Sequence, residues 1–428
     1  MTMQRREYPG LGDALWAGTL ENGLPIYVVP RPGFRRRQAL LAVNYGAAAR
    51  DFTLEGRRES TPAGTAHFLE HKMFDLPEGN AMSIFTARGA DSNAWTAADM
   101  TAYYFECDEL FEENLELLLR LVSTPYFTPE SVEKERGIIA QEILMTEDDP
   151  SFVLYTDAMG ALFERHPLRE SVAGTVESIA GITPETLYAC HRAFYRPSNA
   201  ALCIVGDVEP ERCAEAASRV EWTDGGGCAA PDFGPPEGLE PVKTRTERAM
   251  DVSEPLFTVA AKLCTALPQG EEASRLITAG ALAARCLFGQ SSEFYTSLYA
   301  EGLLRGDFYR DVSPLASTLL FECGGASAEP GRVFERLCAA LSAAAGRGLD
   351  AAGFERTRRA DYGVSLRMLN DADALASALA RCHFGGYGLY EGFEHIRAVT
   401  LGEAEAFVRE YLRPERLAFS LVNPKERT

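Results

Sequence analysis

Two histidines, His67 and His71, stand four positions apart in Thr65–Phe74, a segment without glycine or proline. On a helix, residues i and i+4 lie on the same face, so the two imidazoles can bind one metal ion. Glu70 falls on a neighbouring part of that face, where its carboxylate can reach a water on the metal without coordinating the metal itself. The pattern His-x-x-Glu-His is the inverted zinc motif. The spacing therefore predicts a catalytic zinc site in which Glu70 is the general base.

A catalytic zinc ion usually has three protein ligands and one open position, so a third ligand must come from elsewhere in the chain. The best source is the segment 131–142, in which Glu135 and Glu142 are close to two helical turns apart. Both carboxylates are expected on one face of a helix, with Ile138 and Ile139 turned toward neighbouring packing. The alternatives are that the two histidines only pack or cap a helix, and that Glu142 is an ordinary surface carboxylate.

The composition is that of a folded, acidic protein. A length of 428 residues exceeds what one compact core accommodates, which predicts two domains. There are 62 acidic and 42 basic residues, and the net charge of −20 disfavours nucleic acid as a partner. The ten cysteines form no C-x-x-C pair, and the sequence shows neither a signal peptide nor a run of about 18 apolar residues. We therefore expect a cytoplasmic protein with reduced cysteines and no membrane partner.

The order of apolar and turn residues predicts an α+β fold. Asn22-Gly23 suits a tight hairpin turn between two strands, and apolar residues in 109–122 recur at the helical period. In 223–237, glycine and proline are too dense for a helix or a central strand, which indicates a linker. The predicted domains are an N-terminal zinc-binding catalytic domain at 1–222, a linker at 223–243 and a C-terminal domain at 244–428.

An internal repeat supports this division. Residues 178–211 and 395–427 share one order of elements: an apolar isoleucine, a helix, an aromatic-rich Arg-Pro turn and a strand. A repeat of this length is typical of two similar α+β units rather than of a solenoid, which needs three or more short units. The second copy is expected to share the fold of the first without necessarily sharing its function.

Several segments together resemble the insulinase/pitrilysin family of zinc peptidases, and in particular its short bacterial, zinc-bearing subunits. The resemblance covers nearly the whole chain. It implies two homologous halves, each an antiparallel sheet flanked by helices, that together form half of a clamshell chamber. The segments that carry it are the H-x-x-E-H of His67–His71, the E-x6-E of Glu135–Glu142, Ser92–Thr96 followed by Thr101–Phe105, and the stretches 166–179 and 194–208.

The resemblance also implies roles for the metal-site residues. By their match to the family motif, His67, His71 and Glu142 are expected to hold one Zn2+ per chain. Glu70 is expected to be the catalytic base. Glu135 is expected to contribute to catalysis from behind the metal ligands, without binding the metal itself. Two neutral imidazoles and one carboxylate would leave the zinc site with a net charge of about +1, which favours ionisation of a bound water near neutral pH.

A further implication of the resemblance concerns substrate binding. Asn93, Ala94 and Trp95 are expected on a strand at the edge of a sheet. The unpaired backbone groups of such a strand can bind an extended peptide as an additional strand, which selects for extended shape rather than for sequence. The alternative is a plain antiparallel strand without this role.

The second half departs from the metal motif. If Phe74 is aligned with Phe288, the motif positions become Ala281–Arg285, and no metal can bind there. Active relatives also carry an Arg and a Tyr in this half, whereas here Tyr299 stands at the Arg position and Arg305 near the Tyr position. Three interpretations are open: a homologous partner subunit supplies the pair in a heterodimer, the chain forms a homodimer, or Tyr299 and Arg305 act in swapped roles.

These residues leave three alternative functions for the chain. The leading one is a zinc-dependent endopeptidase subunit that hydrolyses peptides or small unfolded proteins. The alternative is a non-catalytic scaffold subunit of a larger assembly, which has no reason to keep all four of the metal-binding and base residues. The third is a zinc-dependent hydrolase of a non-peptide substrate, which the edge-strand segment disfavours.

Overall fold

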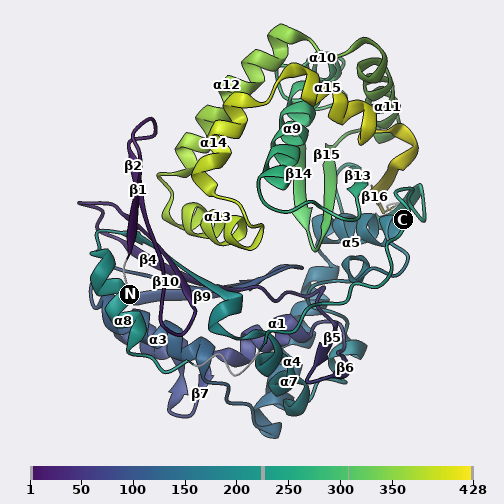
Figure 1. The fold of residues 1–428 in the computed structure, drawn as a ribbon. Helices are drawn as coiled ribbons and strands as arrows, with labels where there is room; N and C mark the ends of the chain where they lie inside the picture. Colours follow the sequence, from purple (N-terminus) through teal and green to yellow (C-terminus); the bar gives the residue numbers. More distant parts are fainter. Residues whose placement is uncertain (1–2, 223–226, 307, 426–428) are drawn as a thin grey trace. The chain divides into compact units, whose positions relative to one another are not determined.

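The computed structural model describes residues 3–222, 227–306 and 308–425 (Figure 1). The described residues group into two compact units, each built from three separate stretches of the chain and each with its own sheet and hydrophobic core. The first unit comprises the residues up to Ile143, Ser171–Phe233 and Leu366–Phe384; the second comprises Leu144–Glu170, Gly234–Ser365 and the residues from Gly385 onward.

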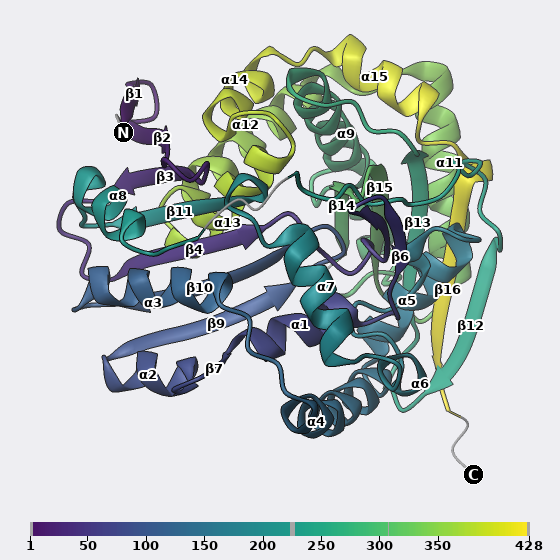
Figure 2. The same cartoon turned by 60° about the horizontal axis from the view of Figure 1, so that its bottom comes forward.

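The sheet of the first unit has seven strands in the order β1-β2-β3-β11-β4-β10-β9. β2 and β3 form the predicted hairpin, whose turn contains Gly23 at a φ of 92°. Figure 2 shows β9 as the outermost strand beside β10. The strand bounds are Gln4–Tyr8 (β1), Asp13–Thr19 (β2), Pro25–Pro30 (β3), Arg37–Val43 (β4), Ala90–Thr96 (β9), Thr101–Cys107 (β10) and Ala200–Gly206 (β11).

Helices cover both faces of this sheet. Alternate strand residues point to opposite faces: Leu41 and Tyr103 join the hydrophobic core with α1 and α3, whereas Gln38 donates a hydrogen bond to Asp373 of α13 on the other face. The helix bounds are Thr65–Met73 (α1), Ala81–Ala87 (α2), Phe111–Ser123 (α3), Pro129–Glu147 (α4), Val176–Ile179 (α6), Pro184–Phe194 (α7), Pro210–Ser218 (α8) and Ala372–Phe384 (α13). Two short pairs complete the unit: Asp51–Leu54 (β5) with Arg57–Ser60 (β6), and Asp75–Leu76 (β7) with Gly79–Asn80 (β8).

The sheet of the second unit has five strands in the order β12-β16-β13-β15-β14. Its strand bounds are Arg245–Met250 (β12), Leu256–Cys264 (β13), Tyr309–Leu315 (β14), Thr318–Ala326 (β15) and Leu417–Pro424 (β16). Its helix bounds are Pro150–Leu162 (α5), Glu271–Phe288 (α9), Glu293–Ala300 (α10), Pro330–Arg347 (α11), Ala351–Met368 (α12, which reaches three residues into the first unit), Leu389–Ala398 (α14) and Leu401–Glu410 (α15).

The two sheets repeat one topology, which confirms the predicted α+β fold of two homologous halves. The order β12-β16-β13-β15-β14 corresponds strand by strand to β3-β11-β4-β10-β9. Each sheet is antiparallel, as expected, apart from one parallel pair: β3–β11 in the first unit and β12–β16 in the second. β11 pairs with β3, and β16 with β12, after long connections that contain helices, and such a long crossover is what parallel pairing requires.

The compact units are not continuous in sequence, unlike the domains expected at 1–222 and 244–428. α5, which precedes the expected linker, packs on β13 and β16 of the second unit. α13, which follows the linker, packs on β11 and β4 of the first unit. The amphipathic pattern of a helix indicates that the helix packs on a sheet but not on which sheet. The sequence therefore contains no signal that α5 belongs to the second unit and α13 to the first.

Residues 223–226 of the expected linker lie outside the described residues. The remainder, 227–243, contains no helix or strand and only an isolated bridge between Pro231 and Phe52. Within the second unit, the Glu237 carboxylate accepts hydrogen bonds from three successive backbone N–H groups just after α5, at 2.7 to 2.8 Å. This part of the linker is therefore fixed to the second unit by specific hydrogen bonds.

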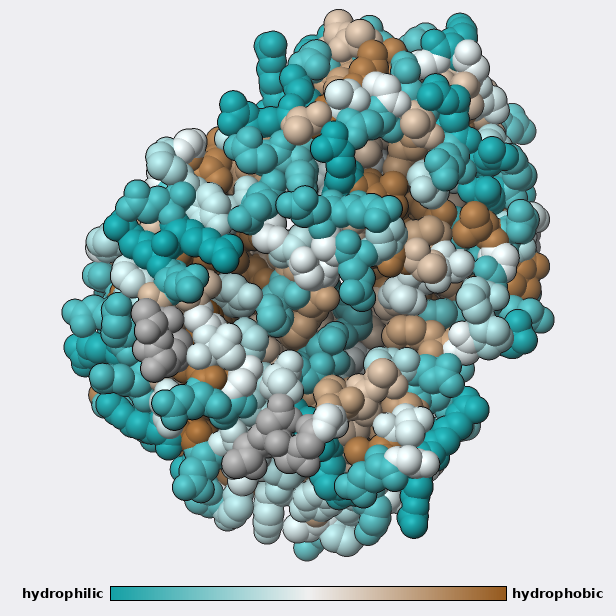
Figure 3. All heavy atoms as spheres, viewed as in Figure 1, coloured by the Kyte–Doolittle hydropathy of each residue, from teal (hydrophilic) through white to brown (hydrophobic). Residues whose placement is uncertain are grey.

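Hydrophilic residues dominate the face seen in Figure 3, with apolar residues in smaller groups. Among the described helices, none combines the length and the apolar character needed to cross a bilayer.

Candidate metal centre

The start of α1, the helix that carries the two histidines, is fixed by a close approach of two chain segments. Gly64 precedes the helix at a φ of 89°, and a Cβ there would lie 2.4 Å from the carbonyl oxygen of Ala173. Gly174 has a φ of 73°, and a Cβ there would lie 2.5 Å from the carbonyl oxygen of Ala63. The Ser178 hydroxyl donates a hydrogen bond of 2.8 Å to that same oxygen. Only glycine fits at both positions, so segment 171–178 sets where α1 begins.

We predict that Gly174→Ala lowers the free energy of unfolding by at least about 2 kcal/mol, because left-handed backbone strain adds to the clash with the neighbouring carbonyl. Chemical denaturation checks this value. The matched control is Gly137→Ala in α4, where a Cβ would meet nothing within 4 Å and should be neutral or stabilising by up to about 1 kcal/mol. Equal stability of the two variants would contradict this role of Gly174.

The helix that carries the two carboxylates, α4, is anchored by Arg136. Its guanidinium donates hydrogen bonds to the carbonyl oxygens of Ile179 (3.3 Å) and Ile182 (2.9 Å). Ile139 is buried in the core, as expected, but Ile138 is 49% exposed. The expectation that both isoleucines pack was wrong, because consecutive helical residues are turned by about 100° and only one of them faces the core.

His67, His71 and Glu142 converge, and each offers one ligand atom within 4.8 Å of the others. Nε2 of His67 lies 3.4 Å from Oε1 of Glu142, and Nε2 of His71 lies 3.5 Å from Oε2. A tetrahedral zinc ion with bonds of about 2.0–2.1 Å separates its ligands by about 3.4 Å, so these donors fit zinc. The other ring nitrogen of His67, Nδ1, is buried and has no hydrogen-bond partner among the described residues.

Glu135 lies behind His71 rather than in the ligand group. Its Oε1 is 3.0 Å from Nδ1 of His71, which leaves Nε2 of that ring to face Glu142. The His71 contact lowers the pKa of Glu135, and the His67 contact lowers the pKa of Glu142. Burial alone would lower the pKa of His71, but the Glu135 hydrogen bond and the nearby carboxylate charges raise it overall. Such a partner fixes the ring orientation and makes the ligand nitrogen more basic.

Glu70 is 7% exposed, and its Oε2 accepts a hydrogen bond of 2.6 Å from the Thr96 hydroxyl. Burial raises the pKa of Glu70, and the nearby His67 imidazole and the Thr96 hydroxyl offset part of this rise. A carboxylate with a raised pKa is a stronger base. Sequence reasoning missed Thr96, although it ends the segment Ser92–Thr96, where strand alternation predicts that Ala94 and Thr96 share a face.

Asn93, Ala94 and Trp95 lie on β9, at the end of the seven-stranded order. β9 pairs with β10, and its other edge has no strand partner among the described residues. Ala94 points to the same face as Thr96, toward α1, whereas Asn93 and Trp95 point to the face covered by α13. An open edge of this kind can accept an extended peptide.

Among its described residues, the second unit has no counterpart of the metal ligands. Ala281–Arg285 lie in α9, and Arg285 forms an ion pair with Asp361, a carboxylate of α12 that is only 7% exposed. In the first unit, α1 and α4 bring metal ligands together, whereas in the second unit α9 and α12 are joined by a salt bridge. In the part of the chain that the structure describes, His67, His71 and Glu142 form the one group that could hold a metal ion.

Tyr299 and Arg305 lie on the surface of the second unit. Tyr299, near the end of α10, is 60% exposed, and its ring stacks on that of Tyr295 at a centroid distance of 6.2 Å. Arg305 is exposed, and its Nε donates to the carbonyl oxygen of Gly302 at 3.2 Å. These contacts are local, so a catalytic role of either residue stays a prediction.

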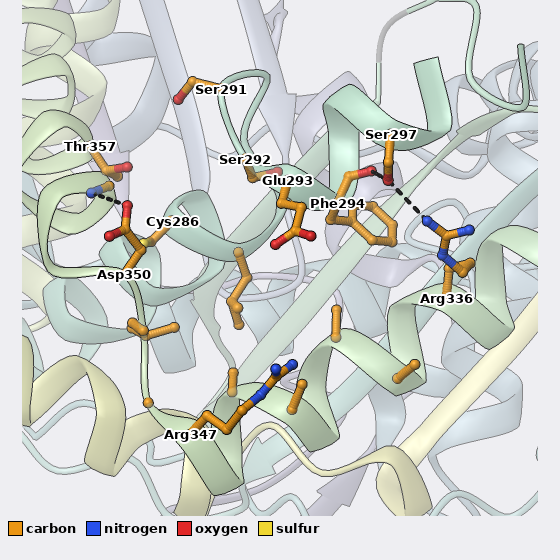
Figure 4. A pocket seen from close by; sticks show the side chains of 18 of the residues that line it. Cys286, Ser291, Ser292, Glu293, Phe294, Ser297, Arg336, Arg347, Asp350 and Thr357 are labelled. Carbon is orange, nitrogen blue, oxygen red and sulfur yellow. Dashed lines mark hydrogen bonds between the residues drawn. The ribbon is translucent and has the colours of Figure 1, made fainter. Parts of the chain in front are cut away.

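A cavity of about 670 Å3 lies within the second unit, among α9, α10, α11 and the start of α12 (Figure 4). Arg336 donates to Ser297 at 3.1 Å, and Asp350 accepts from the backbone of α12 at 2.6 Å. Glu293 and Arg347 point toward the middle of the cavity. Because none of the predicted site residues lines it, this cavity is not the candidate centre.

Comparisons with known proteins show which family the chain resembles. The model of the insulinase family, peptidase family M16, matches residues 56–176, and that of the peptidase M16 inactive domain matches residues 181–360. YmfH of Bacillus subtilis, described as an uncharacterized zinc protease, is 34% identical over 98% of this chain and 99% of its own length. A crystal structure described as an M16-like peptidase, from Alicyclobacillus acidocaldarius, is 31% identical with a TM-score of 0.92 over 99% of both chains. A protease from Helicobacter pylori, at 19% identity, shares the fold with a TM-score of 0.80 over 95% of this chain and 99% of that one.

A pair of homologous α+β units, of which one carries an inverted histidine motif facing a carboxylate helix, defines a class of metallopeptidase-like proteins. The similarity to YmfH over the whole length of both proteins narrows this class to a single family. The chain belongs to the insulinase family, peptidase family M16, as the resemblance of its motifs predicted. Several relatives are named zinc proteases, which supports zinc as the metal of this family.

Proposed function

We propose that the chain is a zinc-dependent endopeptidase subunit that hydrolyses peptides or small unfolded proteins. The observation that carries this proposal is the convergence of His67, His71 and Glu142 within 4.8 Å, with the buried Glu70 held beside them by Thr96. These residues would hold one Zn2+ per chain, with Glu135 orienting His71.

A division of labour among the residues follows from this geometry. Zinc, when bound, supplies Lewis acidity that activates a water for attack on a carbonyl. Glu70 takes up the proton of that water and passes it to the leaving amine. The Thr96 hydroxyl occupies Oε2 of Glu70, which leaves Oε1 to accept the proton. The same Thr96 ends β9, so the base is tied to the strand on which a substrate would lie.

The open edge of β9 supports a peptide as substrate. A peptide added as an extra strand would pair with the outward-facing backbone groups of the Asn93–Trp95 segment, where the Ala94 N–H now donates to Oδ1 of Asn93 at 2.9 Å, and would pass next to Thr96. Such binding depends on extended shape, which folded proteins do not offer. The edge strand thereby disfavours a non-peptide substrate. A non-catalytic scaffold would not require the Thr96–Glu70 and Glu135–His71 hydrogen bonds, which orient the base and a metal ligand.

The second half supports a paired assembly. An Arg and a Tyr that grip the substrate in active relatives are replaced by Tyr299 and Arg305, both of them exposed. We expect a homologous subunit to supply the missing pair, so that the two chains enclose a chamber; a homodimer would lack it. Ten cysteines without a C-x-x-C pair and the acidic composition support a reducing, cytoplasmic setting.

The test is cleavage of a mixed peptide library by the zinc-loaded chain, alone and with a homologue from the same operon that carries the Arg and Tyr but lacks H-x-x-E-H. Adding the homologue is expected to raise kcat/KM about a hundredfold, which is the typical contribution of a charge-stabilising donor. Full activity of the chain alone, lost in Arg305→Ala, would instead assign swapped roles to Tyr299 and Arg305. Absence of cleavage in both mixtures, with zinc bound, would favour the scaffold function.

A further inference from the structure

The helix α13 comes from the second half of the sequence but belongs to the first unit, where it is fastened to the sheet at several points. Near its start, Asp373 accepts a hydrogen bond of 2.9 Å from Gln38 of β4. Near its end, His383 lies 2.9 Å from the hydroxyl of Tyr27 of β3. α13 thus packs on β11 and β4 in the middle of the sheet, and the side chain of Arg381 in its last turn extends from there to β9.

Arg381 contacts the strand proposed to bind substrate. The centre of its guanidinium lies 5.2 Å from the centroid of the Trp95 ring, a cation–π distance, and its Nη1 lies 3.6 Å from Oδ1 of Asp99. Trp95 is on β9, and Asp99 is in the turn that joins β9 to β10. One side chain therefore holds both the outer strand and its turn.

The turn itself has little room to move on its other side. A Cβ on Gly46 would lie 2.5 Å from the backbone of the turn, and the N–H groups of Ala47 and Ala48 donate to the turn at 3.0 and 2.9 Å. Segment 46–48 thus braces the turn by backbone contacts. Arg381 adds the one described cationic side chain that reaches both this turn and Trp95.

Trp95, which Arg381 contacts, is the sequence neighbour of the residue that hydrogen-bonds to the base. Trp95 precedes Thr96, whose hydroxyl donates to Glu70. Trp95 and Thr96 are joined by one peptide bond, so a backbone shift at Trp95, whose side chain is on the α13 face, also moves Thr96, whose side chain is on the α1 face. The open edge of β9 would move with them, and backbone pairing with a peptide depends on that edge.

We propose that Arg381 is a positioning residue, which holds β9 in the place where it pairs with an extended peptide and thereby brings substrate to Glu70. The role rests on the proposed function. It also gives the second half of the chain a part in substrate binding that does not involve Tyr299 or Arg305. Arg381 is 46% exposed, so its replacement removes little buried surface and should leave the fold intact.

The experiment compares Arg381→Ala, Arg381→Lys and the matched control Asp373→Ala, which removes the hydrogen bond between the start of the same helix and Gln38 of β4. The full-length chains are loaded with zinc and combined with the homologous partner if cleavage needs it. For Arg381→Ala we expect KM to rise at least about fivefold with kcat changed less than about twofold, and for Arg381→Lys partial recovery, because Lys keeps the charge over Trp95. Asp373→Ala should leave KM unchanged.

Hydrogen exchange of residues 90–107 provides a second measurement that needs no turnover. Arg381→Ala should speed exchange there at least about fivefold, with Asp373→Ala close to the parent chain. Unchanged exchange and unchanged KM in Arg381→Ala would overturn the proposal, as would equal effects of the two alanine variants. If the parent chain cleaves no peptide, the proposed hydrolysis fails, and the exchange rates alone then decide whether Arg381 holds β9.

Discussion

Glu70→Gln is expected to lower peptide hydrolysis at least about a hundredfold while zinc stays bound. The amide keeps the size of the side chain, and its oxygen can still accept the hydrogen bond that Thr96 donates to Oε2 at 2.6 Å. What it loses is the ability to take up a proton. The measurements are kcat on a quenched fluorescent peptide and zinc content by elemental analysis, made on the same preparation.

The matched control is Glu130→Gln, which makes the same chemical change at an exposed carboxylate in the first turn of α4. It should leave both kcat and zinc content unchanged. Turnover of Glu70→Gln equal to that of the parent chain would show that another group activates the water, and the assignment of the base would be wrong.

His67→Ala and His71→Ala are each expected to reduce the zinc content from about one per chain to near zero after dialysis, because each removes one of only three protein ligands. Activity should disappear with the metal. For His71→Ala, the loss also leaves Glu135 without its 3.0 Å partner. Elemental analysis after dialysis against a weak chelator measures the effect.

A histidine outside the metal centre serves as the control. His395→Ala removes an imidazole whose Nδ1 lies 2.8 Å from the Ser274 hydroxyl in the second unit, and it should keep its zinc. Full zinc occupancy in both His67→Ala and His71→Ala would show that the metal binds elsewhere.

Local sequence patterns predicted much of this molecule. The i, i+4 histidines and the seven-residue carboxylate spacing need only one helix each, so the helical period was sufficient to place them on single faces. The Arg-Pro turns at 196–197 and 413–414 marked the repeat because a helix, a short 3-10 turn and a strand follow one another in both halves. The fold of two homologous halves could therefore be predicted without knowledge of any long-range contact.

Long-range contacts were beyond such patterns. Nothing local shows that Gly174 touches Ala63, or that Ser178 bonds to it, because these residues meet across more than a hundred positions of sequence. The exchange of α5 and α13 between the units was missed for the same reason. Arg381 was missed because its partner Trp95 lies nearly three hundred positions earlier.

Zinc K-edge X-ray absorption on the purified, zinc-loaded chain reports directly which atoms hold the metal. We predict a first shell of nitrogen and oxygen at about 2.0–2.1 Å, with outer-shell scattering from two imidazoles, for His67, His71, Glu142 and one water. Glu142→Gln should weaken zinc binding without changing the count of imidazoles. A first shell containing sulfur at about 2.3 Å, or a single imidazole, would contradict the assignment of the metal centre.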